Sequence, residues 1–200
     1  MPVVPHRLVA RLAVFWAASE QTHRGTCWYG DGESEPHAPM NRINQDDLPW
    51  VERRSPKGKF HKFRRNLSRA LASEAAGPTL RGPAPFEVEL MRLPSGAANF
   101  PFHSHSAEWE CYLILSGSGT MRTAARRTKL APGDCVMCPP GEAHQIVNDG
   151  EGDLVYYVIA NNAPSDVWHY PDSDKWGFSL PDGDDVYFRK SDVDYYEDEE

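Results

Sequence analysis

The stretch HSHSAEWE, residues 103–110, brings two histidines and two glutamates together directly before the apolar run CYLIL. In an extended chain, residues i and i+2 lie on the same face, so His103 and His105 are expected to point the same way. Glu110 follows a short bend, on a strand that can return beside the first. Imidazole nitrogens and carboxylate oxygens are donor atoms for divalent transition metals, so the pattern indicates a metal site.

A third histidine, His144, follows the turn sequence PPGEA on a separate expected strand. Three imidazoles and one carboxylate that converge inside a barrel would form a nitrogen–oxygen metal centre. Four protein ligands on a six-coordinate metal leave two positions open, which is enough for a substrate and a small co-reactant. No other part of the sequence gathers so many potential ligands.

The region that must position these residues alternates between short apolar runs and turn sequences, with no helical period between them. Many short strands at regular spacing predict a sandwich or a barrel, and therefore an all-β fold. The expected strands are 86–93, 108–117, two short strands within 119–130, two more within 135–148, and 154–160.

Two stretches of this region resemble the sequence motifs of the cupins. The first motif, Gly-x5-His-x-His-x3,4-Glu-x6-Gly, runs here from Gly96 to Gly117, with six residues in place of five before His103. The second motif, Gly-x5-Pro-x-Gly-x2-His-x3-Asn, is matched throughout from Gly133 to Asn148. A short spacer, as in microbial cupins, separates the two.

The resemblance covers roughly residues 80–162. It implies a double-stranded β-helix, a jelly-roll barrel, that holds one divalent metal (Fe, Mn, Zn or Ni) in its mouth. It also implies that Asn148 hydrogen-bonds within the barrel and that Glu108 is only an alternative carboxylate, too close to His105 for the motif. The implied metal ligands are His103, His105, Glu110 and His144.

Five apolar or aromatic side chains are expected to share the inner face of the barrel with these ligands: Tyr112, Ile114, Ile146, Tyr157 and Ile159. Three of them, Tyr112, Ile146 and Tyr157, are our candidates for the substrate pocket. A tyrosine hydroxyl could donate a hydrogen bond to a bound substrate.

The chain also resembles a group of single-domain bacterial cupins with SPKGKF before the barrel and YPDS-K after it, here Ser55–Phe60 and Tyr170–Lys175. That group is loosely labelled sugar-phosphate-isomerase-like and has no settled reaction. Two classes of function stay open for this chain. One is a metal-dependent enzyme acting on a small carboxylate or sugar-like substrate, with an Fe-dependent dioxygenase as the first guess and an isomerase or lyase as the alternative. The other is a cupin that binds a small ligand without catalysis.

The sequence divides into four segments. Residues 1–39 are expected to be an extension, upstream of a possible true start at Met40. Residues 40–85 are expected to add N-terminal strands and a basic segment that packs on the barrel, 86–162 to form the barrel, and 163–200 to form an aromatic arm with an acidic tail. Such an arm suits packing along the barrel or across a second subunit, so we predict a homodimer.

The formal net charge is −8, and residues 182–200 carry nine acidic side chains against two basic ones. The body of the protein is therefore near neutral, which gives no general attraction to nucleic acid. No stretch approaches the ~20 apolar residues of a membrane helix. Four cysteines in 200 residues form no disulfide framework, which favours a reducing, cytoplasmic location.

Overall fold

The computed structural model describes residues 42–71, 85–180 and 184–199. The extension expected at residues 1–39 lies outside these ranges. Among the helices that the structure describes, none has the length and apolarity needed to cross a membrane.

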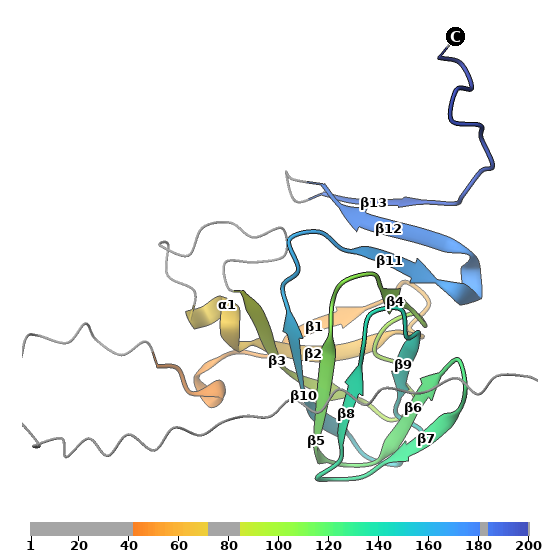
Figure 1. Ribbon diagram of the computed structural model, residues 1–200. Coiled ribbons are helices and arrows are strands. Elements are labelled where there is room, and N and C mark those ends of the chain that lie inside the picture. The colour runs from red at the N-terminus through yellow and green to blue at the C-terminus, as the bar shows by residue number, and fades with distance from the viewer. Residues whose placement is uncertain (1–41, 72–84, 181–183, 200) are drawn as a thin grey trace, which may run out of the picture. The chain divides into compact units, whose positions relative to one another are not determined.

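Short antiparallel strands form most of the described chain, which confirms the all-β prediction (Figure 1). A short 3-10 helix, η1 (Gln45–Asp47), precedes the first strand, and the helix α1 (Leu67–Leu71) links β2 to the segment before β3. The strands are β1 Val51–Arg54, β2 His61–Asn66, β3 Phe86–Leu93, β4 Ser104–His105, β5 Glu110–Ser116, β6 Gly119–Thr123, β7 Arg127–Leu130, β8 Cys135–Cys138, β9 His144–Val147, β10 Leu154–Asn161, β11 Val167–Tyr170, β12 Lys175–Ser179 and β13 Asp185–Phe188.

The strands assemble into three sheets, and their antiparallel arrangement is that of a double-stranded β-helix. A six-stranded sheet has the order β1-β2-β3-β10-β5-β8, and a three-stranded sheet has the order β7-β6-β9. The third sheet, β13-β12-β11-β4, joins the C-terminal arm to the barrel. The jelly-roll prediction is therefore confirmed.

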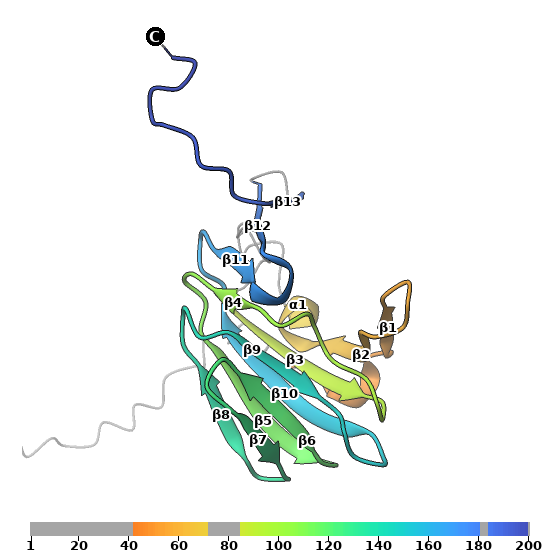
Figure 2. The ribbon, with the colours of Figure 1, turned by 90° about the vertical axis from the view of Figure 1, so that its right-hand side faces the viewer.

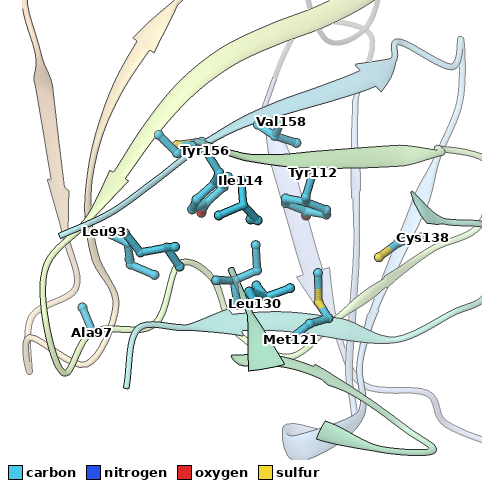
Figure 3. Packing of buried hydrophobic residues seen from close by; sticks show 12 residues of the cluster. Leu93, Ala97, Tyr112, Ile114, Met121, Leu130, Cys138, Tyr156 and Val158 are labelled. Atoms are coloured by element: carbon cyan, nitrogen blue, oxygen red, sulfur yellow. The ribbon is translucent and has the colours of Figure 1, made fainter. Parts of the chain in front are cut away.

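Side chains from the inner faces of the two barrel sheets form one apolar core (Figure 3). Strand β10 runs through the middle of the six-stranded sheet, paired with β3 on one side and β5 on the other. Its buried side chains alternate with more exposed ones, as expected of a strand with one face on a core. The fully buried members of the core include Leu93, Tyr112, Ile114, Ile146, Leu154 and Tyr156.

The motif glycine Gly117 sits where the barrel turns tightly between β5 and β6. Its φ is +81°, and a Cβ atom added there would lie 2.3 Å from the carbonyl oxygen of Asp153. Only glycine tolerates both the left-handed backbone and this close approach. The predicted role of Asn148 is also confirmed, because its Nδ2 donates to the carbonyl oxygens of Leu93 and Gly152, both at 2.7 Å.

The basic segment before the barrel forms an antiparallel hairpin at the edge of the six-stranded sheet. Strand β1 is exposed along its whole length. Among the strands that the structure describes it pairs with β2 alone, and β2 in turn pairs with β3. Lysine and arginine on such an edge disfavour pairing with other chains.

The C-terminal arm folds onto its own chain. Strand β11 pairs with β4, so that Trp168 lies opposite His105 and His169 opposite Ser104. Both ribbon views show β11 beside β4 at one end of the barrel, with β12 and β13 farther out in the same sheet (Figures 1 and 2). Within this single chain the arm pairs with the barrel through β4, and the homodimer stays a prediction.

Candidate metal centre

The four residues implied as ligands lie together at the end of the barrel that the arm covers. His105 belongs to the two-residue strand β4, Glu110 begins β5 and His144 begins β9. The backbone of His103 pairs with that of His144, through N–H to carbonyl contacts of 3.2 and 2.8 Å. All four side chains are buried.

The polar atoms of this cluster face one another around the carboxylate of Glu110. Its Oε2 lies 2.6 Å from Nε2 of His144 and 3.4 Å from Nε2 of His105. The His103 ring centroid is 4.8 Å from that of His144 and 4.9 Å from that of His105. One ligand atom each from His103, Glu110 and His144 lies within 4.8 Å of the others, which is close enough for one ion to contact all three.

Each of the three imidazoles is held in place through its Nδ1 atom. In His103, Nδ1 lies 2.9 Å from the carbonyl oxygen of Pro101. In His144, Nδ1 lies 2.9 Å from the carbonyl oxygen of Glu142. A carbonyl oxygen can only accept, so Nδ1 carries the hydrogen and Nε2 is the ring atom left to face the cluster.

In His105 the acceptor at Nδ1 is a carboxylate, Oδ2 of Asp166 at 2.7 Å. The Nε2 atom of His105 is buried and has no hydrogen-bond partner. A buried nitrogen with an unused lone pair is costly unless a cation or a donor reaches it. The donor set and this atom together fit a divalent metal.

Asp166 was not predicted from the sequence, because it lies outside both motifs and is 61 residues from His105. Its other oxygen accepts from the backbone N–H of Ala107 at 2.8 Å and from the hydroxyl of Ser106 at 3.2 Å. One carboxylate therefore fixes both the His105 ring and the bend before β5. Glu108, the alternative carboxylate, lies on this Nδ1 side of His105, with Oε2 3.7 Å from Nδ1.

The Glu110 carboxylate stays anionic inside the protein, beside the ring of His144. Burial by itself raises the pKa of Glu110, but its interactions with the His105 and His144 rings outweigh burial and hold that pKa well below its usual range. Burial lowers the pKa of His103 to about 3, so this ring is neutral at pH 7. Burial also disfavours the charged form of His144, but hydrogen bonds with Cys138 and Glu110 raise its pKa to about 10. Without a metal, a proton thus lies between His144 and Glu110, and a cation binding there would displace it.

A cavity of about 280 Å³ opens next to the cluster. Its volume is close to the lower end, about 300 Å³, of the range for small-molecule sites. The lining combines three of the four candidate ligands with aromatic side chains, most of them from the arm, and with polar side chains of β2 and β3. The lining residues are Arg64, Glu87, Glu89, Phe100, Pro101, His103, His105, Glu108, Glu110, Trp168, Tyr170, Asp185 and Tyr187.

The three residues proposed for the substrate pocket do not line this cavity. Tyr112 and Ile146 are fully buried in the core, although the hydroxyl of Tyr112 reaches to 3.2 Å from Nε2 of His144. The prediction for Tyr157 was wrong: this side chain lies on the outer face of β10, where its hydroxyl donates to Oε1 of Gln45. Ile159 shares that outer face and is 40% exposed, whereas Tyr156 lies on the inner face.

A double-stranded β-helix with His-x-His, a glutamate and a later histidine at one end is the arrangement of a cupin. Residues 89–160 match the family model described as Cupin domain, and they form the cupin domain of this chain. The described N-terminal strands and the arm lie outside the matched range.

Known proteins with related sequences support the same assignment. The chain is 32% identical over 107 residues to auxin-binding protein 1 of Arabidopsis thaliana, covering 48% of this chain and 52% of that protein. It is 33% identical over 69 residues to an oxalate-binding protein of Thermotoga maritima, covering 34% of this chain and 56% of that protein. The chain thus spans about half the length of the curated relatives it matches.

Among solved structures, a protein of Acidithiobacillus ferrooxidans provisionally named a sugar phosphate isomerase superposes with a TM-score of 0.59. It is 27% identical, and the match covers 68% of this chain and 81% of that one. The match therefore extends beyond the residues of the cupin family model.

Proposed function

We propose that the cupin domain binds one divalent transition metal through Nε2 of His103, His105 and His144 and the carboxylate of Glu110. The observation that carries the proposal is the anchoring of all three imidazoles through Nδ1, which turns three Nε2 atoms toward one buried carboxylate. Histidines that bind metals typically donate their other N–H to a carboxylate or a carbonyl oxygen. The ligand set accepts Fe, Mn, Zn or Ni.

We further propose that the protein is an enzyme for a small, oxygen-rich substrate, either a carboxylate or a sugar-like molecule, that enters the cavity beside this cluster. A bound metal would supply Lewis acidity or, if it is iron, the redox chemistry of an oxygenase. The chain itself orients the ligands, keeps Glu110 anionic and lines the cavity beside the cluster with aromatic side chains. The Fe-dependent dioxygenase stays the first candidate, and a metal-dependent isomerase or lyase is its alternative.

Binding without catalysis is the second candidate function. Both curated relatives are named for binding, one of them for binding oxalate. Oxalate presents two oxygens to a metal, and the cavity has room for a molecule of this size.

The first test is the metal content of untagged protein that is purified without a chelator. We expect about one metal per chain in the wild type and a small fraction of that in His144→Ala. His61→Ala is the matched control, because His61 lies outside the cluster and pairs with Glu52 on β1. Its metal content should equal that of the wild type. A folded wild-type protein that acquires no metal, even after incubation with each of the four, would contradict the proposal.

The identity of the metal then selects the assay. Stoichiometric iron directs the search to oxygen consumption with small chelating acids and catechols. Zinc, manganese or nickel directs it to isomerase and lyase reactions. If the protein holds stoichiometric metal and binds one of these small molecules tightly, but turns over none of them, the binding function would be favoured.

A further inference from the structure

The inner face of the six-stranded sheet changes from apolar to polar where it reaches the cavity. Side chains of β3 at positions 87, 89, 91 and 93 share one face, and Met91 and Leu93 lie in the barrel core. Glu87 and Glu89 continue the same face toward the cavity and line it. Glu89 is only 3% exposed, so this carboxylate is not a surface group.

The two glutamates are held side by side by a single amide. The Nδ2 atom of Asn66 donates to Oε1 of Glu87 at 2.7 Å and to Oε1 of Glu89 at 2.8 Å. Its Oδ1 atom accepts from the backbone N–H of Arg69 at 2.7 Å, which fixes the orientation of the amide at the start of α1. Arg64 adds one further donor, also to Oε1 of Glu89, at 3.0 Å.

This arrangement costs stability, because two carboxyl groups lie close together and are largely removed from water. Burial, and then the neighbouring Glu89, raise the pKa of Glu87 to about 7. Near neutral pH Glu87 is therefore protonated in a large share of the molecules, and in that form its carboxyl group can donate a hydrogen bond as well as accept one. A hydroxyl group, which both donates and accepts, complements such a pair.

The charges around the cavity argue against binding of a phosphate group in the part that Glu87 and Glu89 line. Five acidic side chains line the cavity, and Arg64, which pairs with Glu89, is the arginine among the described lining residues. A dianion would meet repulsion there. The aromatic side chains of Phe100, Trp168, Tyr170 and Tyr187 supply the remaining wall, against which the carbon skeleton of an uncharged chain can pack.

We propose that Glu87 and Glu89 bind the hydroxyl groups of an uncharged polyhydroxy chain, the other end of which occupies the cluster of His103, His105, Glu110 and His144. This inference rests on the proposed function, because it requires an oxygen-bearing head group at the metal. It narrows the substrate class to small hydroxy acids or sugars with several hydroxyl groups and no phosphate at the distal end.

Two hydroxy acids that share a head group distinguish binding at the histidine–glutamate cluster from binding at Glu87 and Glu89. Glycolate carries an α-hydroxy carboxylate and nothing more, whereas gluconate adds a chain of hydroxyl groups to that head. We would measure the affinity of both for Mn(II)-loaded wild-type protein by calorimetry at pH 7. We expect gluconate to bind at least about tenfold more tightly, since a charge-assisted hydrogen bond contributes about 1.5–3 kcal/mol.

The variant Glu87→Leu has a side chain of similar size that cannot hydrogen-bond. We expect it to reduce the affinity ratio of gluconate over glycolate to about one. Glu151→Leu is the matched control: Glu151 is exposed and lies outside the cavity lining. This control should keep the wild-type ratio.

The outcomes distinguish the two proposals. If wild-type protein binds glycolate but has no preference for gluconate, or if Glu87→Leu keeps the preference, the assignment of the glutamate pair is overturned while the metal proposal stands. If 6-phosphogluconate binds more tightly than gluconate, the exclusion of phosphate is overturned. If neither acid binds and Mn(II) itself is not retained, the proposed function fails together with this inference.

Discussion

Replacing Asp166 by asparagine tests whether the His105 ring is oriented for a metal. Asparagine has the same shape, and its carbonyl oxygen can still accept from the N–H of Ala107, as Oδ1 of Asp166 does at 2.8 Å. The amide nitrogen would then replace Oδ2, which lies 2.7 Å from Nδ1 of His105. Because an amide N–H₂ group can only donate, it would favour the tautomer with hydrogen on Nε2. That tautomer has no lone pair to offer a metal at Nε2.

The expected loss follows from the number of ligands affected. Only one of the four proposed ligands is disturbed, and the partners that hold His103 and His144 are unchanged. Removing such a partner of a metal ligand typically costs about 10–100-fold in metal affinity. We therefore expect a loss of about 1.4–2.7 kcal/mol in the free energy of metal binding.

The assay is a competition for Zn(II) between the protein and a chromophoric chelator. Asp172→Asn is the matched control, because Asp172 accepts two hydrogen bonds from Arg122 on the exposed surface and lies outside the cluster. Thermal unfolding of the metal-free proteins checks that both variants are folded. If folded Asp166→Asn protein binds Zn(II) as tightly as the control, the orientation of His105 by Asp166 is not what prepares the site.

Two further predictions concern stability. Burial, helped by Arg64, lowers the folded-state pKa of Lys62 to about 7, against 10.5 for an ordinary lysine. The unfolded chain then binds more protons between pH 7 and pH 10.5, so wild-type stability should gain from this group as pH rises through that window. The two pKa values differ by about 3.5, which corresponds to at most about 5 kcal/mol, so Lys62→Met should be more stable than wild type by several kcal/mol at pH 6–7, and the difference should vanish above pH 10.5. An equal difference at both pH values in denaturant unfolding would refute this cause. In the same experiment Gly117→Ala should lower the free energy of unfolding by about 3 kcal/mol, and Gly96→Ala by only about 1 kcal/mol. Both glycines have a positive φ, but of the two only Gly117 has backbone atoms within 4 Å of the added Cβ. Equal losses would show that the close approach to Asp153 is not the cause.

The barrel and the histidine–glutamate cluster could be predicted because their signals are local. Strand alternation places His103 and His105 on one face, and the resemblance to the two cupin motifs implies which strands return beside them. The turn at Gly117 is likewise a local requirement, since a positive φ and a near backbone both select glycine.

The sequence of β10 does not show which of its side chains face the core. The run LVYYVIA is apolar at both odd and even positions, so no polar residue marks the outer face. Tyr157 was therefore placed inside, while the structure has Tyr156 there. The opposite difficulty arises at β3, where simple alternation would put Glu87 and Glu89 in solvent, although both line the cavity. A buried carboxylate pair has no signal in a hydropathy pattern.

Strand β4 is only two residues long, and it pairs with β11, a strand from the later part of the chain. Its second residue, His105, has its backbone opposite Trp168 and its ring against Asp166, both of which lie beyond the last barrel strand in the sequence. During synthesis, the strands up to β10 emerge before the arm and can pack their core before it exists. The nascent barrel would then present its histidines without the carboxylate that orients one of them. If the proposed site binds a metal, its full affinity should therefore be reached only after the arm has paired with β4.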